Sequence, residues 1–254
     1  MLKKASLTVL LIISLCFPCF SAINFDGTND YLASVLGVLD SAENDYTVSF
    51  WVKTGNLTTD ATFSSDRIGS NYGYKFHIYI DGNDTDKVFF VVYTGSGAEF
   101  TEFSNDTVLL PNTWYYIAYI HDGVNDLVYG YVNAVVASTS STRDFAQSNQ
   151  VTIGAWRHDS GNIFFFDGQI SDYAIWNKVL SFSDIMEIYH SKLKHTPLQV
   201  EYDNLVIYLP LDDHPHSDTA NSANGLTFLD MSTKNNYGTA TGCVSKSESF
   251  LSYP

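Results

Sequence analysis

The sequence predicts an all-β protein, built as an antiparallel β-sandwich with one short helix near residues 181–192. Short segments in which apolar and polar residues alternate recur along the chain, and clusters of Gly, Asn, Asp and Ser separate them. This is the pattern of strands joined by tight turns in an antiparallel sandwich. Helical periodicity is nearly absent elsewhere, so the predicted core is formed by sheets.

Residues 1–22 are expected to be a signal peptide. Two lysines open the chain, and residues 7–17 form an apolar stretch too short to span a bilayer comfortably. Small residues follow, which predicts cleavage near Ser21 or Ala22. The mature chain is then expected to be secreted, extracellular or at the cell surface, without membrane insertion. An uncleaved membrane anchor is the alternative.

The charge of the chain is strongly one-sided. Without the two lysines of the expected signal, 11 basic groups stand against 28 acidic groups, a net charge of −17. This argues against nucleic acid and anionic membrane surfaces as partners, and it favours solubility and cation binding. Cys243 would be the one cysteine left, so no internal disulfide is expected.

Alternation predicts the strands in order along the chain. The expected segments are 46–53, 74–80, 88–93, 114–120, 127–137 and 151–156. The Asp81-Gly82 pair is expected to turn the second of these into the third as a hairpin. Residues 114–120 are apolar on both faces, as expected of a strand covered on both sides.

A strand and a helix are predicted next. Asp167-Gly168 is a tight-turn signal, and residues 170–176 alternate with the period of a strand. The even-numbered side chains of that strand are expected on one face and the odd-numbered ones on the other. Ser181 precedes Asp184 by three residues, which predicts a capping box at the start of the helix.

Four ordered motifs resemble laminin-G-like jelly-roll domains of the concanavalin A-like lectin and glucanase superfamily. They are Phe25–Leu32, Tyr46–Lys53, Trp114–Gly123 and Phe165–Ser181. The resemblance spans about residues 23–192 and implies that the sandwich is a jelly roll. The sequence departs from the family pattern at Ser171 and Asp172, and at Ala134, where a glycine is usual.

The segment after His195 raises a question of order. A strand at 205–211 and the polar loop that follows it resemble elements that usually open the family's domain, yet here they come last. One interpretation is a circular permutation, in which residues 196–254 complete the jelly roll of 23–195. The other is the truncated start of a second repeat. The first is favoured, and it predicts that strand 205–211 lies beside the strand around 170–176.

The resembled group includes glycosidases, so the sequence bears on catalysis as well as on binding. Retaining glycosidases need two carboxylates about 5 Å apart, and jelly-roll glucanases place E-x-D-x-E on one strand. The nearest approach is Glu201-Tyr202-Asp203, whose next same-face residue is Leu205. We therefore predict that the chain is not an enzyme. His214-Pro215-His216 is interpreted as a solvated loop rather than a transition-metal site.

Calcium is the expected cofactor. It needs six to eight oxygen ligands, which loop Asp and Asn residues supply readily. Asp26, Asn29 and Asp30 crowd one turn, and Asp167 lies in another motif that matches the family strongly. The alternative is that these residues only form turns.

The candidate sugar-binding residues are Trp156, His77, Tyr79 and Lys75. Trp156 precedes a polar Arg-His-Asp stretch, and an aromatic face beside polar groups suits a sugar ring. The other three candidates have the solvent-facing parity of their strand. Ordinary edge packing of Trp156 is the alternative, and the remaining three tryptophans are expected to be structural.

These observations favour a secreted, non-catalytic, carbohydrate-binding or adhesive module whose partner is a glycan. The alternative is an extracellular module that binds another protein, and a glycoside hydrolase is a third class. An aromatic stripe with a groove on an exposed sheet face would favour sugar binding, whereas a flat acidic face would favour a protein partner. A glycosidase would need a carboxylate pair in a cleft.

Overall fold

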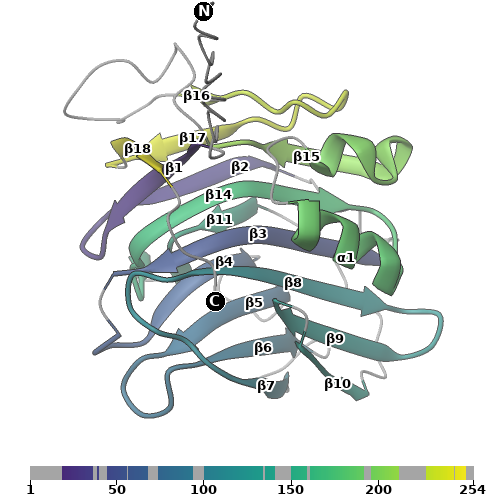
Figure 1. Cartoon of the computed structure of the whole chain (residues 1–254), viewed down its shortest axis with the longest axis horizontal. Coiled ribbons are helices and arrows are strands. Elements are labelled where there is room, and N and C mark those ends of the chain that lie inside the picture. The colour runs from purple at the N-terminus through teal and green to yellow at the C-terminus, as the bar shows by residue number, and fades with distance from the viewer. Residues whose placement is uncertain are drawn as a thin grey trace, which may run out of the picture.

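The computed structural model describes residues 19–36, 39, 45–55, 57–67, 74–93, 100–133, 135–140, 150–158, 161–191, 196–211, 227–242 and 244–249. These residues form two antiparallel sheets that pack face to face, as predicted, with one α-helix on the outside (Figure 1). The predicted all-β jelly-roll sandwich is therefore confirmed.

The first sheet has eight strands. In spatial order they are β10 (Val135–Ser140), β9 (Leu127–Val132), β8 (Trp114–Asp122), β3 (Tyr46–Thr54), β14 (Asp167–Trp176), β1 (Cys19–Asp26) and β18 (Val244–Ser249), with β15 (Leu205–Leu209) also paired to β14. Every residue of β8 is buried, because the interior covers one face of this strand and the helix side covers the other. This confirms the prediction from its two apolar faces.

The second sheet also has eight strands. In spatial order they are β16 (Thr227–Phe228), β17 (Gly238–Thr241), β2 (Tyr31–Leu36), β11 (Gln150–Ile153), β4 (Ala61–Arg67), β5 (Tyr74–Asp81), β6 (Lys87–Tyr93) and β7 (Phe100–Val108). The predicted hairpin between β5 and β6 is confirmed by pairs such as Ile78 with Phe90. A separate hairpin joins β12 (Trp156–His158) to β13 (Gly161–Ile163).

The main core lies between the two sheets. Phe50 of β3, Phe76 of β5 and Tyr119 of β8 are fully buried members of this cluster, in which aromatic rings pack against aliphatic side chains. The alternation that predicted these strands therefore also identified the faces that meet in the interior.

A second apolar cluster covers the outer face of the first sheet. Helix α1 (Phe182–Ser191) lies across that face (Figure 1) and buries Ile185 and Ile188 against it. The three tryptophans predicted to be structural, Trp51, Trp114 and Trp176, are all buried in this cluster. Helix α1 and the side chains packed beneath it therefore cover the outer face of the first sheet.

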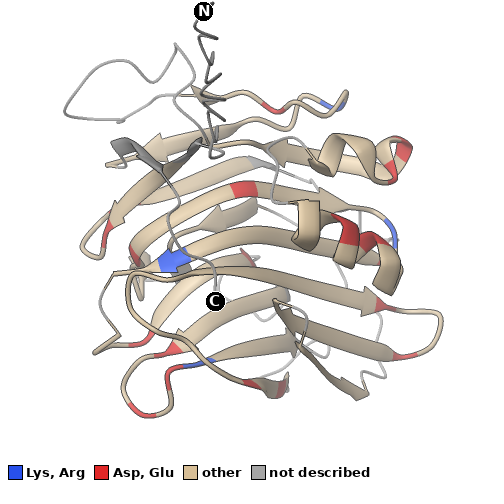
Figure 2. Cartoon of the chain, in the orientation of Figure 1, with Lys and Arg blue, Asp and Glu red and all other residues tan. Residues whose placement is uncertain are grey.

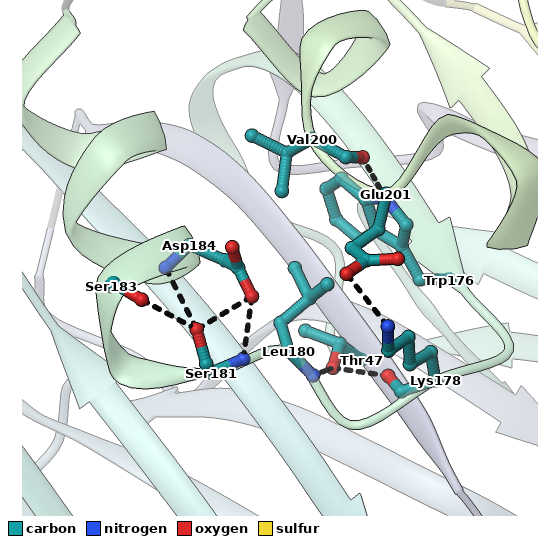
Figure 3. A network of polar contacts seen from close by, with 9 residues as sticks. All are labelled: Thr47, Trp176, Lys178, Leu180, Ser181, Ser183, Asp184, Val200 and Glu201. Atoms are coloured by element: carbon teal, nitrogen blue, oxygen red, sulfur yellow. Dashed lines mark hydrogen bonds and ion pairs between the residues drawn. The ribbon is translucent and has the colours of Figure 1, made fainter.

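The predicted capping box starts α1. Ser181 donates its backbone N–H to Asp184 Oδ2 at 2.8 Å, and Asp184 donates its own N–H to Ser181 Oγ at 3.2 Å (Figure 3). Nearby, Trp176 Nε1 donates to the carbonyl of Val200 at 2.9 Å. This bond fixes the two short 3₁₀ helices, η1 (Thr196–Gln199) and η2 (Tyr202–Asn204), beside the sheet.

The prediction that side chains 170–176 alternate strictly between the two faces of the strand is wrong, because β14 contains a bulge. Ile170, Tyr173 and Ile175 all belong to the core between the sheets, although their numbers differ in parity. The pairing of β14 with β3 shifts register between Ser171 and Ala174, and Asp172 between them has a φ of 51°. A bulge of this kind adds one residue and reverses the faces beyond it.

Two other predicted segments are divided by turns. Residues 127–137 form β9 and β10 rather than one continuous segment, because Asn133 turns the chain with a φ of 55°. Residues 151–156 also divide, since β11 ends at Ile153 and Gly154 has a φ of 83°. Glycine suits that conformation, and the Phe25 ring occupies the space that a Cβ of residue 154 would need.

The C-terminal segment joins both sheets. The predicted neighbour of the strand around 170–176 is confirmed, because β15 pairs with β14 through Tyr173 and Leu209 among others. Strands β16 and β17 extend the second sheet from β2. Asp230 holds the loop between β16 and β17 against β15, because it accepts hydrogen bonds from the backbone N–H groups of Tyr208, Ser232 and Asn236. The domain limits 23–195 and 196–254 stay a prediction.

The expected signal peptide falls mostly outside the described residues, as do 212–216 and Cys243. Strand β1 begins at Cys19, and its pairs with β14 run from Ile23 to Asp26. Cleavage after Ser21 or Ala22 would leave those pairs in place. Within the part of the chain that is described, no helix is long and apolar enough to cross a membrane.

Candidate ligand-binding cleft

Five ring side chains form a continuous stack that we call the aromatic row. Its members, in order, are Phe164, Trp156, His77, Tyr79 and Phe89. Neighbouring ring centroids lie 5.0–5.6 Å apart, and their planes differ by 20–25°. These are offset-stacked geometries, which favour aromatic contacts beyond simple burial.

The row forms because of strand parity. Phe76, Ile78 and Ile80 of β5 enter the core between the sheets, so His77 and Tyr79 face outward. Phe89 of β6 lies directly opposite Tyr79 in the hairpin register and stacks on it. The row therefore lies on the outer face of the second sheet, on the side of the sandwich opposite α1.

Trp156 and Phe164 reach the row from the small hairpin. Trp156 opens β12 immediately after the turn at Gly154, and Phe164 follows β13. Trp156 is half-buried and belongs to neither apolar cluster. Its ring stacks with those of His77 and Phe164. Trp156 is thus held at the rim of the sheet rather than inside the fold.

All members of the aromatic row except Phe89 line a cleft with a volume of about 280 Å³. Its described lining residues are Asp60, Ala61, Thr62, His77, Tyr79, Val91, Phe100, Glu102, Trp156 and Phe164. His77 and Val91 are only 7% and 2% exposed, so they form the floor. Phe100 and Phe164, which are 53% and 43% exposed, belong to the open edges.

His77 presents a neutral imidazole to the cleft. Burial lowers the pKa of His77 to about 3, so the ring is uncharged at neutral pH. Its Nε2 is hydrogen-bonded to Thr62 Oγ1 at 2.9 Å, which fixes the ring against Trp156 and Tyr79. The ring serves as a rigid, polar part of the floor.

Two carboxylates complete the cleft. Tyr79 donates its phenol O–H to Glu102 Oε2 at 3.0 Å. Burial and the charge of Glu102 raise the pKa of Tyr79, so the phenol stays protonated. Asp60 Oδ1 is buried and has no hydrogen-bond partner among the described residues. The sequence alone does not mark Asp60 as a cleft residue, because its place depends on pairing between strands.

The structure brings three of the four predicted sugar-binding residues into one cleft. Trp156, His77 and Tyr79 line it together. Lys75 lies on β5 with the same parity, but its side chain is outside the described residues. Their role in binding stays a prediction. The glucanase-like Glu201-Tyr202-Asp203 stretch is not a strand, because it lies at η2.

The residues predicted for calcium form a tight turn. Asp26 Oδ1 accepts the N–H groups of Thr28 at 2.8 Å and Asn29 at 3.3 Å. Asp30 Oδ2 accepts the N–H of Asp26 at 2.8 Å. Burial raises the pKa of Asp30, and the charge of Asp26 raises it further, against the lowering effect of that backbone bond.

Asp167 joins this turn as the β14 residue paired with Asp26. The bonds within the turn match the alternative in which these residues only shape the chain. Within the described residues, no group of three His, Cys, Asp or Glu side chains is arranged to hold a metal ion. Calcium binding at Asp26, Asn29, Asp30 and Asp167 stays a prediction.

Residues 26–186 match the model of a laminin G family, which is described as the concanavalin A-like lectin/glucanases superfamily. The chain belongs to this family, which confirms the resemblance seen in its four motifs. No curated protein sequence matches the chain.

Solved structures share the fold. A Bacteroides ovatus protein, provisionally described as carbohydrate binding, has a TM-score of 0.64 and 19% identity over 90% of this chain and 60% of its own. This chain therefore spans less than two thirds of that protein. A SAP-like pentraxin from Limulus polyphemus has a TM-score of 0.54 and 14% identity over 68% of this chain and 83% of its own.

A further similar structure is the CBM40 module of the Ruminococcus gnavus IT-sialidase, solved with α2,3-sialyllactose. It has a TM-score of 0.53 and 14% identity over 66% of this chain and 96% of its own. At these identities the likeness concerns the fold.

Proposed function

We propose that the chain is a carbohydrate-binding module and that the cleft beside Trp156 holds the sugar. The observation that carries this proposal is the aromatic row along a cleft on the outer face of the second sheet. An aromatic stripe with a groove favours a sugar over a protein partner.

The lining chemistry suits a sugar ring. Pyranose C–H groups pack against aromatic surfaces, while hydroxyls need hydrogen-bonding groups at fixed positions. Trp156 and Phe164 supply aromatic surface, and Thr62, Asp60 and Glu102 supply oxygens at the same cleft. The cleft is close to the size range of small-molecule sites, which begins at about 300 Å³.

The similar structures support this proposal at the level of the fold. One is provisionally described as a carbohydrate-binding protein, and another is a sialidase module solved with a bound sialyllactose. The same fold can serve other functions, so the cleft itself provides the stronger argument.

Three finer properties belong to the same proposal. The chain is secreted after signal cleavage, its main activity is binding rather than catalysis, and calcium acts through the Asp26 turn instead of inside the cleft. The acidic surface supports the first of these, because it keeps a secreted protein soluble. In the described residues the acids outnumber the basic groups, and several lie where strands turn (Figure 2).

Glycoside hydrolysis is a second candidate, because Asp60 and Glu102 line the same cleft. A carboxylate pair in a cleft is the feature that a glycosidase requires. Release of reducing sugar by the wild-type protein, with loss of release in both Asp60→Asn and Glu102→Gln, would establish this activity. Binding without release in the same samples would leave the protein a binding module.

A glycan array tests the proposed function directly. Wild-type protein is expected to bind a defined subset of glycans, and Trp156→Ala is expected to lose that binding. Phe182→Ala is the matched control, because Phe182 is an exposed aromatic residue on α1, on the opposite side of the sandwich. Absence of binding by the wild-type protein, or equal loss in both variants, would contradict the proposal.

A further inference from the structure

We infer that the cleft selects sugars that carry a free, protonated amino group and rejects acidic sugars. This inference rests on the proposed function and adds the chemical class of the ligand. It comes from the charges of the described lining residues: Asp60 and Glu102 are negative, and none is lysine or arginine.

Asp60 contributes the first negative group to the lining of the cleft. Its Oδ1 is buried, and none of the described residues donates a hydrogen bond to it. A buried carboxylate oxygen that has lost water is costly unless a donor replaces the water. An ammonium group in the cleft compensates the charge of the Asp60 side chain, whereas a hydroxyl group carries no charge to do so.

Glu102 provides a second negative group at the same cleft. Its Oε2 accepts the Tyr79 phenol at 3.0 Å, which fixes the carboxylate at the edge. Asp60, Tyr79 and Glu102 line the same cleft, and the charges of both acids, with that of Asp81, raise the pKa of Tyr79. A sugar carboxylate bound here would meet like charges, which is unfavourable.

The rings add to the preference for a cation. Trp156 and Phe164 present aromatic surface to the cleft, and the faces of such rings attract ammonium groups. The same rings receive the C–H groups of the sugar. The cleft therefore combines the apolar surface that a sugar needs with carboxylates that distinguish an amino sugar from its neutral and acidic counterparts.

A matched pair of ligands tests this inference. The probes are a β-1,4-linked glucosamine tetrasaccharide with free amines, its fully N-acetylated counterpart, and 3′-sialyllactose. Titrations of the full chain at about pH 6 keep the amines protonated. We expect the free-amine ligand to bind about tenfold more tightly than the acetylated one, about 1.4 kcal/mol, and sialyllactose to show no binding.

Variants test the carboxylate charges of the cleft separately from the aromatic surface of Trp156. Asp60→Asn and Glu102→Gln are each expected to weaken binding of the free-amine ligand more than binding of the acetylated ligand, and so to lower the preference for the amine. Glu187→Gln is the control for net charge, because Glu187 is exposed on α1 away from the cleft, and it is expected to change nothing.

The outcomes distinguish the two proposals. Equal or tighter binding of the acetylated or sialylated ligand, abolished by Trp156→Ala, would overturn the amino-sugar inference and leave the sugar-binding function standing. A preference for the amine that persists in both carboxylate variants would also overturn it. Failure of all three ligands and of the wider array to bind would overturn both proposals.

Discussion

The indole of Trp156 stacks on the imidazole of His77, with ring centroids 5.3 Å apart and planes 22° from parallel. This contact joins the small hairpin to the second sheet and sets one wall of the cleft against its floor. His77 is held by its hydrogen bond to Thr62 and by stacking on Tyr79, which all belong to the second sheet. The sheet therefore sets the position of the ring on which Trp156 stacks.

Neutral His77 predicts a specific loss of stability in acid. The pKa of His77 in the folded state, about 3, lies below the usual 6.5. The contribution of His77 to the free energy of unfolding is therefore fully present above pH 6.5 and is lost as the pH falls toward 3. In that window the group contributes a slope of up to about 1.4 kcal/mol per pH unit. Denaturant unfolding of the wild type and His77→Phe across this range measures the difference in slope.

The control for that experiment is His190→Phe, because His190 is exposed on α1. The phenylalanine at position 77 keeps the stacking and loses the bond to Thr62, so its stability at neutral pH is expected to fall by about 1 kcal/mol. Identical pH slopes for the wild type and His77→Phe would show that His77 is not held neutral by burial.

Trp156 and Trp51 should respond differently to truncation. Trp51 is 4% exposed within the cluster under α1, so Trp51→Ala is expected to cost about 3–5 kcal/mol of unfolding free energy. Trp156 lies at the rim, and Trp156→Ala is expected to cost on the order of 1 kcal/mol. Equal losses in denaturation curves would place Trp156 in the core and remove it as a binding platform.

Asp30 gives a test of both pH dependence and calcium. Because its folded pKa is raised, the carboxyl contributes stability below its usual pKa of 3.8, and this contribution is lost as pH rises through the folded value. Asp30→Asn keeps an oxygen for the Asp26 N–H. The variant is therefore expected to melt at a higher temperature than the wild type at neutral pH in chelator, with the difference vanishing in acid.

Calcium changes the expected order of those melts. If the ion binds at Asp26 and Asp30, millimolar calcium should raise the wild-type melting temperature by several degrees, because it binds the folded state. Asp30→Asn should show no such rise. Wild-type melts that coincide in calcium and in chelator would leave the four residues as turn formers.

The C-terminal strand is expected to be part of one cooperative unit. Ile207 of β15 is fully buried in the core between the sheets, so Ile207→Ala should cost about 2–5 kcal/mol in a single unfolding transition. Leu229→Ala, at a site that is 52% exposed, is the near-neutral control. A wild-type stability in Ile207→Ala, or a separate transition for this segment, would contradict the permuted jelly roll.

The strands could be predicted because alternation is a local property. The sequence of 46–53 identified β3 and its buried face, and the doubly apolar 114–120 identified a strand covered on both sides. The bulge at Asp172 and the turn at Asn133 could not be predicted in this way. Both place a non-glycine residue at positive φ, which the surrounding sheet stabilises rather than the local sequence.

The cleft could be predicted only in part. Parity placed His77 and Tyr79 on an outer face, and the polar stretch after Trp156 suggested a rim position. Glu102 could not be assigned, because its contact with Tyr79 depends on the register of β5, β6 and β7 together. Strand pairing therefore supplied the acidic side of the cleft, which one-strand patterns do not contain.

The most direct measurement is an equilibrium titration of the wild type and Trp156→Ala with the glycan that binds most strongly on the array. If Trp156 is the platform, its loss should weaken binding by about 1–3 kcal/mol, roughly tenfold to a hundredfold, while the fold stays intact. Equal affinities for the two proteins, or no glycan bound by the wild type at all, would contradict sugar binding at this cleft.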